Sequence, residues 1–329
     1  MKIITITSGK GGVGKTIIAV NLAISLAKKG YKTCLFDADT GLANVNILMG
    51  IIGNYTLEDV ISGSKPLKDI IIKDWNNIDI IPGSSGVEQF ETLEKKELEN
   101  IITQFSNMNE YDYIIVDTGA GISKAVVSFC LASSILIVAI VPEPSSLTDS
   151  YSLLKVLKFN GFNSRVNIIS NKAESETLGE KTFQKFKNTV LKYIDLNLSF
   201  LGSIPEDKSV TKAVSMQLPF IINFPDSPSS KKILKIADII INSGNENISQ
   251  SEETSFDSFI KSCSNFFQSG LELIRPKEEI PELENEEYKT ENLNKNEKKA
   301  VLEKIDLLIQ KNNSMIYELE ELKKMILKK

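Results

Sequence analysis

The chain has 329 residues, a formal net charge of −5 and no histidine. The missing histidine excludes Ser-His-Asp triads, histidine general bases and histidine-ligated zinc or haem. Any catalysis must therefore use carboxylates, lysines, hydroxyls, backbone amides or a metal bound through oxygen. The acidic balance gives no global signature for nucleic acid. The three cysteines are far apart and form no CxxC pair, which is typical of a reducing compartment.

Short β-branched runs alternate with longer helical patterns over residues 1–243. Apolar runs of this kind, separated by helices, predict a mostly parallel sheet covered on both faces, which is a doubly wound α/β fold. The expected strands are residues 2–7, 32–36, 78–81, 113–116, 135–141, 166–169 and 199–204. Amphipathic segments between several of these strands predict helices at residues 16–29, 93–106 and 147–160.

Residues 9–16 form a GxxxxGK[ST] motif between the first expected strand and the first expected helix. In such a loop the glycines let backbone N–H groups turn towards phosphate oxygens, and the helix N-terminus adds positive potential. Lys15 is expected to reach the β- and γ-phosphates, and the Thr16 hydroxyl to ligate Mg²⁺. A chance glycine-rich turn is the alternative, which the flanking elements disfavour. The predicted nucleotide-binding residues of this loop are Gly9, Lys10, Gly11, Gly12, Val13, Gly14, Lys15, Thr16 and Ile17.

Aspartates stand at the ends of two expected strands: Asp37 and Asp39 on one, and Asp117 on the other. Ligands of open α/β sheets bind at the carboxyl ends of the strands, so these side chains can face the phosphates. Phosphoryl transfer needs one group to orient the attacking water and others to hold hydrated Mg²⁺. Each aspartate alone has the alternative of capping a helix. Together with the phosphate loop, these aspartates predict a metal-assisted phosphoryl-transfer site that uses Mg²⁺.

Three stretches resemble a single protein family. Lys10 begins the run Lys-Gly-Gly-Val-Gly-Lys-Thr, which resembles the deviant Walker A motif of the MinD/ParA group of dimeric ATPases. The run Asp-Ala-Asp-Thr-Gly-Leu-Ala-Asn-Val-Asn from Asp37 resembles switch I of FlhG (also FleN or YlxH), the MinD-like flagellar-number ATPases. The run Asp-Thr-Gly-Ala-Gly-Ile-Ser from Asp117 resembles the FlhG switch II. The resemblance covers residues 1 to about 240.

This resemblance implies an ATPase that uses ATP and Mg²⁺ and forms a homodimer on binding ATP. In the family the extra lysine crosses the dimer interface to the partner's nucleotide, a role that falls on Lys10. The implied catalytic residues are Lys10, Lys15 and Asp39, with Asp39 positioning the hydrolytic water. Asp37 supports the magnesium region, and Asp117 holds Mg²⁺ through water. Thr40 departs from the family pattern, which commonly has leucine there.

Two further segments indicate which nucleotide base is bound. The run Asn-Lys-Ala-Glu from Asn171 superficially resembles the guanine-reading NKxD motif, but its carboxylate is one methylene too long. In the MinD group an asparagine at this strand end contacts adenine, and a later Ile-Pro-Glu-Asp segment walls the base. That resemblance assigns the base contacts to Asn171, Pro205, Glu206 and Asp207 and favours ATP over GTP. A strand-end cap is the alternative for Asn171.

The chain changes character after residue 243. Residues 244–255 lack periodicity and predict a linker, and residues 256–274 predict a helix with one apolar face. Residues 275–296 predict an acidic flexible linker, and residues 297–329 a helical C-terminal tail. This last helix has the pattern of a short coiled coil or a partner-binding helix, and a solvated tail fits equally well.

The apolar helix at residues 256–274 has two interpretations. FlhG and MinD proteins have a membrane-targeting amphipathic helix after the ATPase domain, and this segment occupies that place. Docking on the ATPase domain is the alternative, and both hold if the helix is released in the ATP dimer. Its few lysines and arginines predict weak attraction to anionic lipid. The expected membrane contacts are Phe256, Phe259, Ile260, Phe266, Phe267 and Leu271.

The resemblance to FlhG implies a slow, dimer-dependent ATPase switch that regulates flagellar number or placement. The implied location is cytoplasmic, peripherally at the inner face of the cell membrane, with an FlhF-like GTPase and flagellar switch or basal-body proteins as partners. Many FlhG proteins have a segment before the first strand that stimulates FlhF, and this chain begins at the strand, so stimulation by such a peptide is not expected. Nucleic acid is not expected either. The alternatives are a MinD- or ParA-type positioning ATPase for the division site or DNA, and a nucleotide-stabilised scaffold that acts through its C-terminal helices.

Overall fold

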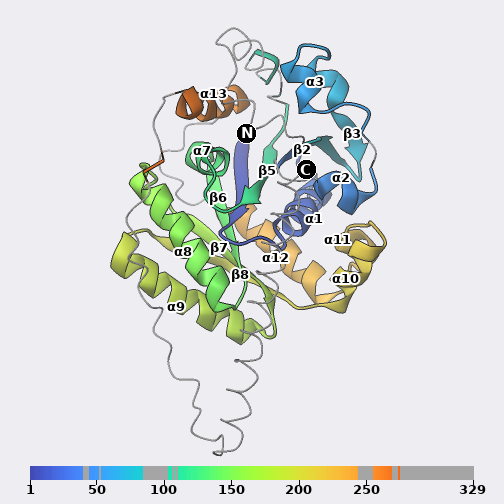
Figure 1. Ribbon diagram of the computed structural model, residues 1–329. Helices are drawn as coiled ribbons and strands as arrows, with labels where there is room; N and C mark the ends of the chain where they lie inside the picture. Colours follow the sequence, from blue (N-terminus) through green and yellow to red (C-terminus); the bar gives the residue numbers. More distant parts are fainter. Residues whose placement is uncertain are drawn as a thin grey trace, which may run out of the picture. The chain divides into compact units, whose positions relative to one another are not determined.

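A computed structural model describes residues 1–39, 44–51, 53–83, 103–105, 108, 110–243, 255–268 and 273–274. In this part an eight-stranded sheet has the order β3-β4-β2-β5-β1-β6-β7-β8 (Figure 1). All neighbouring strands are parallel except β3 and β4. The strands are β1 (Lys2–Ser8), β2 (Thr33–Ala38), β3 (Ile72–Trp75), β4 (Ile78–Ile81), β5 (Tyr113–Ala120), β6 (Ile135–Ile140), β7 (Val166–Ala173) and β8 (Leu198–Pro205). The predicted doubly wound, mostly parallel sheet is confirmed.

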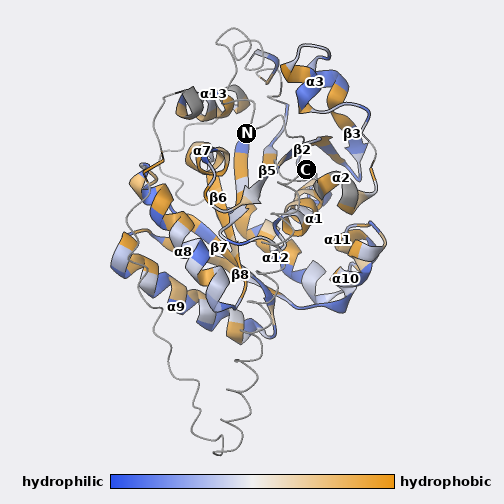
Figure 2. Ribbon diagram, in the orientation of Figure 1, coloured by the Kyte–Doolittle hydropathy of each residue, from blue (hydrophilic) through white to orange (hydrophobic). Residues whose placement is uncertain are grey.

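Helices cover both faces of this sheet. Helices α1 and α12 pack on one face, and α7, α8 and α9 pack on the other (Figure 1). The apolar residues gather on the strands and on the sides of the helices that face them (Figure 2). The longer helices are α1 (Lys15–Lys28), α7 (Lys124–Ala132), α8 (Pro144–Phe159), α9 (Glu176–Ile194), α10 (Lys208–Ser215), α12 (Pro228–Ser243) and α13 (Phe256–Gln268). The short ones are α2 (Asn44–Met49), α3 (Leu57–Ile61), α4 (Leu67–Ile70) and α11 (Phe220–Asn223).

The strand predictions differ from the structure mainly at their carboxyl ends. β5 continues to Ala120 and β7 to Ala173, because strand pairing extends through the polar residues that were expected to be loop. β3 was not predicted, since its central Lys-Asp pair interrupts the apolar pattern. Antiparallel pairing with β4 forms it. The helix predicted at residues 93–106 lies outside the described residues except for 103–105, which are helical.

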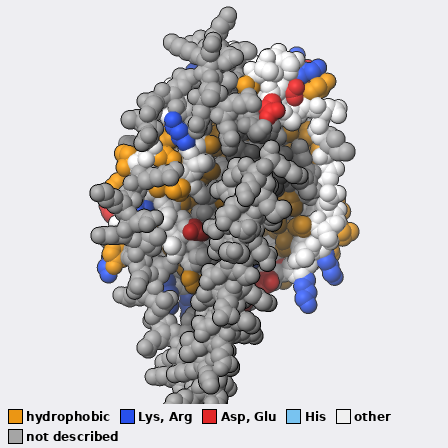
Figure 3. Space-filling view, in the orientation of Figure 1, with side chains coloured by type: hydrophobic (Ala, Val, Ile, Leu, Met, Phe, Trp, Pro, Cys, Tyr) orange, Lys and Arg blue, Asp and Glu red, His pale blue; other side chains and the backbone are white. Residues whose placement is uncertain are grey.

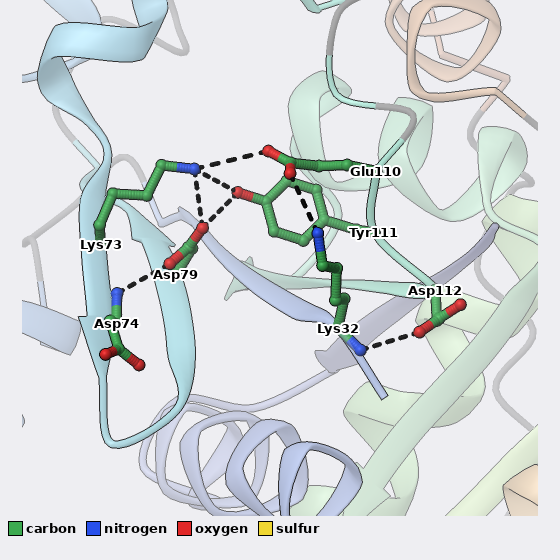
Figure 4. Close-up of polar contacts among 7 residues, drawn as sticks. All are labelled: Lys32, Lys73, Asp74, Asp79, Glu110, Tyr111 and Asp112. Carbon is green, nitrogen blue, oxygen red and sulfur yellow. Dashed lines mark hydrogen bonds and ion pairs between the residues drawn. The ribbon is translucent and has the colours of Figure 1, made fainter. Parts of the chain in front are cut away.

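A polar cluster joins the antiparallel edge strands to the start of β5 (Figure 4). The Asp79 carboxylate accepts hydrogen bonds from Lys73 Nζ at 2.8 Å and from the Tyr111 hydroxyl at 2.5 Å. Lys73 also pairs with Glu110 at 3.6 Å, and Glu110 pairs with Lys32 at 3.3 Å. The cluster lies at the amino ends of β2 and β5, opposite the edge where ligands of such sheets bind. Its role is therefore structural.

We expect the free energy of unfolding of the Asp79→Asn variant to be about 1 kcal/mol lower near pH 7, because the neutral amide weakens two charge-assisted hydrogen bonds at a partly buried site. Partial burial acts to raise the Asp79 pKa, but Lys73 and Tyr111 outweigh it, and the pKa lies below its usual value. Such a carboxylate stabilises the fold above its unfolded pKa of about 3.9 and loses that contribution as pH falls through the folded pKa. Urea unfolding should show the difference in the free energy of unfolding shrinking as the pH is lowered below about 3.9. A difference that does not shrink below that pH would contradict the assignment.

Helix α13 lies on α7 at the side of the sheet that holds α8 and α9 (Figure 1). Phe256, Phe259 and Ile260 are buried in one cluster with Phe36 of β2 and Phe129 of α7. The Phe259 ring stacks on Phe129 with centroids 5.8 Å apart. Among the described helices, none combines the length and apolarity needed to cross a bilayer. The amphipathic helix is thus docked on the domain in this conformation.

Candidate functional site

The phosphate loop connects β1 to α1, as its motif predicts. Gly14 precedes α1 with a φ of 100°, a left-handed backbone conformation that residues other than glycine rarely adopt. Gly9 approaches α8 so closely that a Cβ there would lie 2.1 Å from the carbonyl carbon of Asp149. The loop is therefore built against α8 as well as between β1 and α1.

Lys15 is the first residue of α1, and its side chain is 7% exposed. Burial lowers the pKa of its ammonium group, while the charges of Asp117 and Asp39 act to raise it. The three charged groups predicted from separate stretches of sequence thus lie close enough to interact. The neighbouring Thr16 stands in the first turn of α1, where its hydroxyl can face a bound cation.

Asp37 and Asp117 lie side by side on paired strands, and both are fully buried. No hydrogen bond of normal geometry reaches either carboxylate oxygen of Asp117, although the Thr16 hydroxyl is near enough to act to lower its pKa. Burial and the charge of Asp37 raise the pKa of Asp117 well above its usual value, and burial raises the pKa of Asp37 to about 7. Two adjacent buried carboxylates, of which Asp117 has oxygens without a hydrogen-bond partner, fit a divalent cation, which keeps such groups ionised.

This donor set suits Mg²⁺ in particular. The described residues hold no cluster of three or more His, Cys, Asp or Glu side chains that could bind a metal without help. Mg²⁺ in phosphate sites is held by one or two carboxylates, waters and the phosphates themselves. Thr16, Asp37 and Asp117 provide this kind of incomplete shell, which a nucleotide would complete.

Asp39 lies immediately beyond β2 and faces switch II. A Cβ built on Gly119 would be 3.3 Å from Asp39 Oδ1, so the two predicted switches meet here. The Asp37 carboxylate accepts the N–H of Asp39 at 3.2 Å and that of Val45 at 3.3 Å. One side chain therefore holds the chain both where it leaves β2 and where it enters α2. Thr40 lies outside the described residues.

Lys10 is held within its own chain by two groups that the sequence analysis missed. Its Nζ donates to Glu143 Oε2 at 3.0 Å and to Ser145 Oγ at 2.8 Å. Both partners stand at the start of α8, just after β6. Both follow the carboxyl end of a strand next to β1 and so belong to the ligand-binding edge, but this strand order is known only from the structure.

The predicted base-binding segments come together at the other side of the loop. They line a cavity of about 220 Å³ beside Ile17. The Asn171 amide donates to the carbonyl of Val13 at 2.7 Å. Lys172, whose role the sequence analysis left open, lines the same cavity. The predicted residues among its walls are Ile17, Asn171, Pro205, Glu206 and Asp207.

The Asp207 carboxylate is already engaged. Its Oδ1 accepts the N–H of Ser209 at 2.8 Å and caps α10, and its Oδ2 accepts the N–H of Ser229 at 3.2 Å. These bonds tie the start of α10 to the start of α12. Asp207 therefore shapes the cavity wall by holding two helices, and its predicted contact with a base stays a prediction. The sequence signal for such a helix cap is an aspartate or asparagine directly before the first residue of a helix.

The six predicted membrane residues have different positions. Phe256, Phe259 and Ile260 are buried under α13, and Phe266 is half-buried against the cluster of α7, α8 and α9. The side chain of Phe267 and the whole of Leu271 lie outside the described residues. In this conformation the apolar face of α13 contacts protein, so any lipid contact by Phe256, Phe259 or Ile260 requires the helix to leave its dock.

Comparison with known proteins gives consistent matches. Residues 1–241 match the model of the ParA family, described as NUBPL iron-transfer P-loop NTPase. The chain is 37% identical to the antiactivator FleN of Pseudomonas aeruginosa over 238 residues, 72% of this chain and 85% of that protein. It is 34% identical to the flagellum site-determining protein YlxH of Helicobacter pylori, over 73% of this chain and 82% of the relative. A septum site-determining protein MinD with Mg-ADP from Pyrococcus horikoshii superposes with a TM-score of 0.59 at 28% identity, covering 74% of this chain and 97% of the other.

Proposed function

We propose a function on one premise: this chain belongs to the MinD/ParA family of P-loop ATPases and is of the FlhG type. The family fixes ATP binding and hydrolysis as the activity. We propose further that the chain is a slow switch that dimerises on ATP and regulates flagellar number or placement. The observation that carries the proposal is the phosphate loop beside the buried, unpartnered Asp117, in a chain similar to FleN and YlxH.

Each predicted residue has a task in hydrolysis that its position supports. The loop amides and Lys15 bind the phosphates and balance charge on the γ-phosphoryl group. Asp39, next to Gly119 of switch II, orients the attacking water in line with that group. Magnesium held near Thr16, Asp37 and Asp117 would supply neutralisation of the developing charge on the phosphate oxygens. The oxygen-rich set explains how a chain without histidine performs this chemistry.

Dimerisation would use Lys10. Its side chain is 38% exposed and forms an exposed ion pair with Glu143, a type of contact worth at most about 1 kcal/mol. Leaving Glu143 for a phosphate of the partner's nucleotide therefore has a small cost. ATP binding and dimerisation then become one event, as they do where a second subunit completes a phosphate site.

Membrane attachment would follow from the dock of α13. Helix α7 begins at its cap residue Ser123, only a few residues after Asp117, and it carries Phe129 under α13. A rearrangement of switch II on ATP binding would move α7 and weaken the dock. The released face of α13 would then bind a membrane peripherally, at the inner face of the cell membrane. Flagellar assembly proteins and an FlhF-like GTPase are the partners that fit this scheme.

The proposal is tested by size-exclusion chromatography with light scattering, with ATP, with ADP and with no nucleotide, each with and without liposomes. We expect a monomer with ADP and a dimer with ATP, and co-migration with liposomes mainly in the ATP sample. A monomer under every condition would contradict the switch. A separate phosphate-release assay with liposomes addresses the scaffold alternative. Membrane or partner binding by a chain that hydrolyses no ATP would favour that alternative.

The Phe129→Ala variant tests the dock without changing the helix that binds lipid. Loss of one stacked aromatic partner removes about 1 kcal/mol or more from docking, so liposome binding without ATP should rise several-fold. Phe183→Ala is the matched control, because it removes a comparable stack, with Phe200 at 4.7 Å, on α9. Sedimentation with liposomes measures both. An equal rise in the two variants would mean that general destabilisation, not release of α13, exposes the membrane face.

Two rival functions within the fold have little support. Iron transfer, named in the description of the family model, relies on accessible thiolates, whereas Cys34, Cys130 and Cys263 are all buried, and burial raises the pKa of Cys130 to about 12. Non-specific DNA binding of the ParA kind needs a basic surface. On the one face that Figure 3 shows, the lysine and arginine side chains of the described residues are interspersed with acidic and apolar ones and do not merge into one basic patch. Salt-dependent retention on DNA would restore this second rival.

A further inference from the structure

Lys172 has a left-handed backbone, with a φ of 52°, although it lies within β7. The other described non-glycine residues with positive φ are Asp74, Asn76, Asn77, Asp195 and Gln217. Four of these five are aspartate or asparagine, which tolerate this conformation, whereas lysine pays about 1 kcal/mol or more for it. Strain of this kind persists only where surrounding contacts impose it, often at functional sites. Lys172 therefore has contacts that require the conformation.

Those contacts are with the phosphate loop. Lys172 Nζ donates to the carbonyl oxygen of Gly12 at 2.9 Å, and Asn171 Nδ2 donates to that of Val13 at 2.7 Å. Consecutive side chains of a regular strand point to opposite faces. The register of β7 against β8 shifts between Ser170 and Ala173, and this irregularity lets both side chains reach the loop. Two neighbouring residues of one strand thus hold two neighbouring carbonyls of the loop.

Holding these carbonyls fixes the opposite side of the same peptides. In a planar trans peptide the C=O and the N–H point in opposite directions. The Gly12 carbonyl shares its peptide with the N–H of Val13, and the Val13 carbonyl shares its peptide with the N–H of Gly14. With the two oxygens drawn towards β7, these N–H groups point away from it, towards the space that the loop encloses. Backbone N–H groups of such loops are the phosphate ligands.

We propose that Lys172 is a positioning residue for phosphate binding: it orients the amides of the loop and does not read the base. This inference rests on the proposed function, since it takes the loop to bind a nucleotide. Direct contact of Lys172 with the base is the competing role, because its side chain also lines the cavity beside Asn171 and Pro205. The two roles differ in whether a phosphate ligand without a base is affected.

The test compares ADP with inorganic pyrophosphate, each displacing a fluorescent ADP analogue in the presence of Mg²⁺. Lys172→Met keeps most of the side chain and removes the donor. We expect both ligands to bind about tenfold more weakly, the effect of losing one charge-assisted hydrogen bond that orders the loop. Lys172→Arg restores a cationic donor and should stay within about twofold of the native chain. Lys181→Met, an exposed lysine of α9, should change neither affinity.

Each outcome separates the hypotheses. Weaker ADP binding with unchanged pyrophosphate binding would overturn the proposal in favour of a base contact, and unchanged binding of both would overturn it outright. Failure of the native chain to bind either ligand would refute the nucleotide function itself, before Lys172 is tested. Lys172→Gly relieves the strained backbone and lacks the donor, so it should show the same tenfold loss even if the methionine variant folds poorly. A native affinity in Lys172→Gly would also overturn the proposal.

Discussion

Lys15→Ala loses nucleotide binding, with an expected fall in ADP affinity of about 100-fold or more. In ADP the charge-assisted contacts of Lys15 with β-phosphate oxygens, each worth about 1.5–3 kcal/mol, are lost. The loss is not compensated by solvent, because Lys15 is buried between the loop and the carboxylates of Asp39 and Asp117. Isothermal titration with Mg-ADP measures the effect directly.

The matched control for Lys15 is Lys29→Ala, at the opposite end of α1. Lys29 forms an exposed ion pair with Asp238 at 2.5 Å, so its removal tests the loss of a lysine from the same region without touching the loop. ADP affinity should remain that of the native chain, and stability should fall by no more than about 1 kcal/mol. Comparable ADP affinity in the two variants would mean that the phosphates bind somewhere else.

Asp39→Ala keeps ATP but hydrolyses it about 10²- to 10⁴-fold more slowly, the range expected when a group that orients or deprotonates the nucleophile is removed. Its affinity for ATP should change little, because the loop and Lys15 remain intact. The ATP-bound dimer should therefore accumulate. Phosphate release gives the rate, and light scattering in ATP gives the mass. Turnover at the native rate would remove Asp39 from the catalytic role.

A variant of Asp37 tests whether the effect of Asp39→Ala comes from losing the group that positions the water or from losing any negative charge at the site. Asp37→Asn removes a buried charge from the same site but leaves Asp39 in place, and Asp37 holds the N–H groups of Asp39 and Val45. We expect that variant to lose both magnesium affinity and turnover, whereas Asp39→Ala loses turnover alone. Identical magnesium dependence in the two variants would contradict this division of roles.

The sequence was sufficient for the loop and the strand-end carboxylates because each is a local pattern. The GxxxxGK[ST] motif is typical of one loop conformation between a strand and a helix. Asp37 and Asp117 lie near the carboxyl ends of two strands whose parallel pairing places them together. Contacts between distant residues were not accessible in the same way. Nothing near Lys10 in the sequence indicates Glu143, which follows a strand added on the other side of β1. For Asp207 the sequence predicts a base contact, and the structure adds a helix cap that the prediction did not include.

Residues 256–274 illustrate a different limit. An apolar helix face is recognised by its spacing, but the same spacing suits a lipid surface and a protein surface equally. The structure adds the missing partner, since Phe36 and Phe129 provide an aromatic surface that faces Phe256 and Phe259. What remains a prediction is the condition under which the helix leaves that surface.

The approach of Gly9 to α8 makes tolerance to mutation unequal on the two sides of one contact. A Cβ at position 9 would collide with backbone atoms of Asp149 and Ser150, which no side-chain rearrangement can move aside. The helix offers only its main chain here, so the identity of residue 149 matters little to the fit. In a saturation library, position 9 should accept glycine alone, while position 149 should accept many residues. The close contact between Gly9 and α8 would thus restrict the residue type at position 9 but not at position 149.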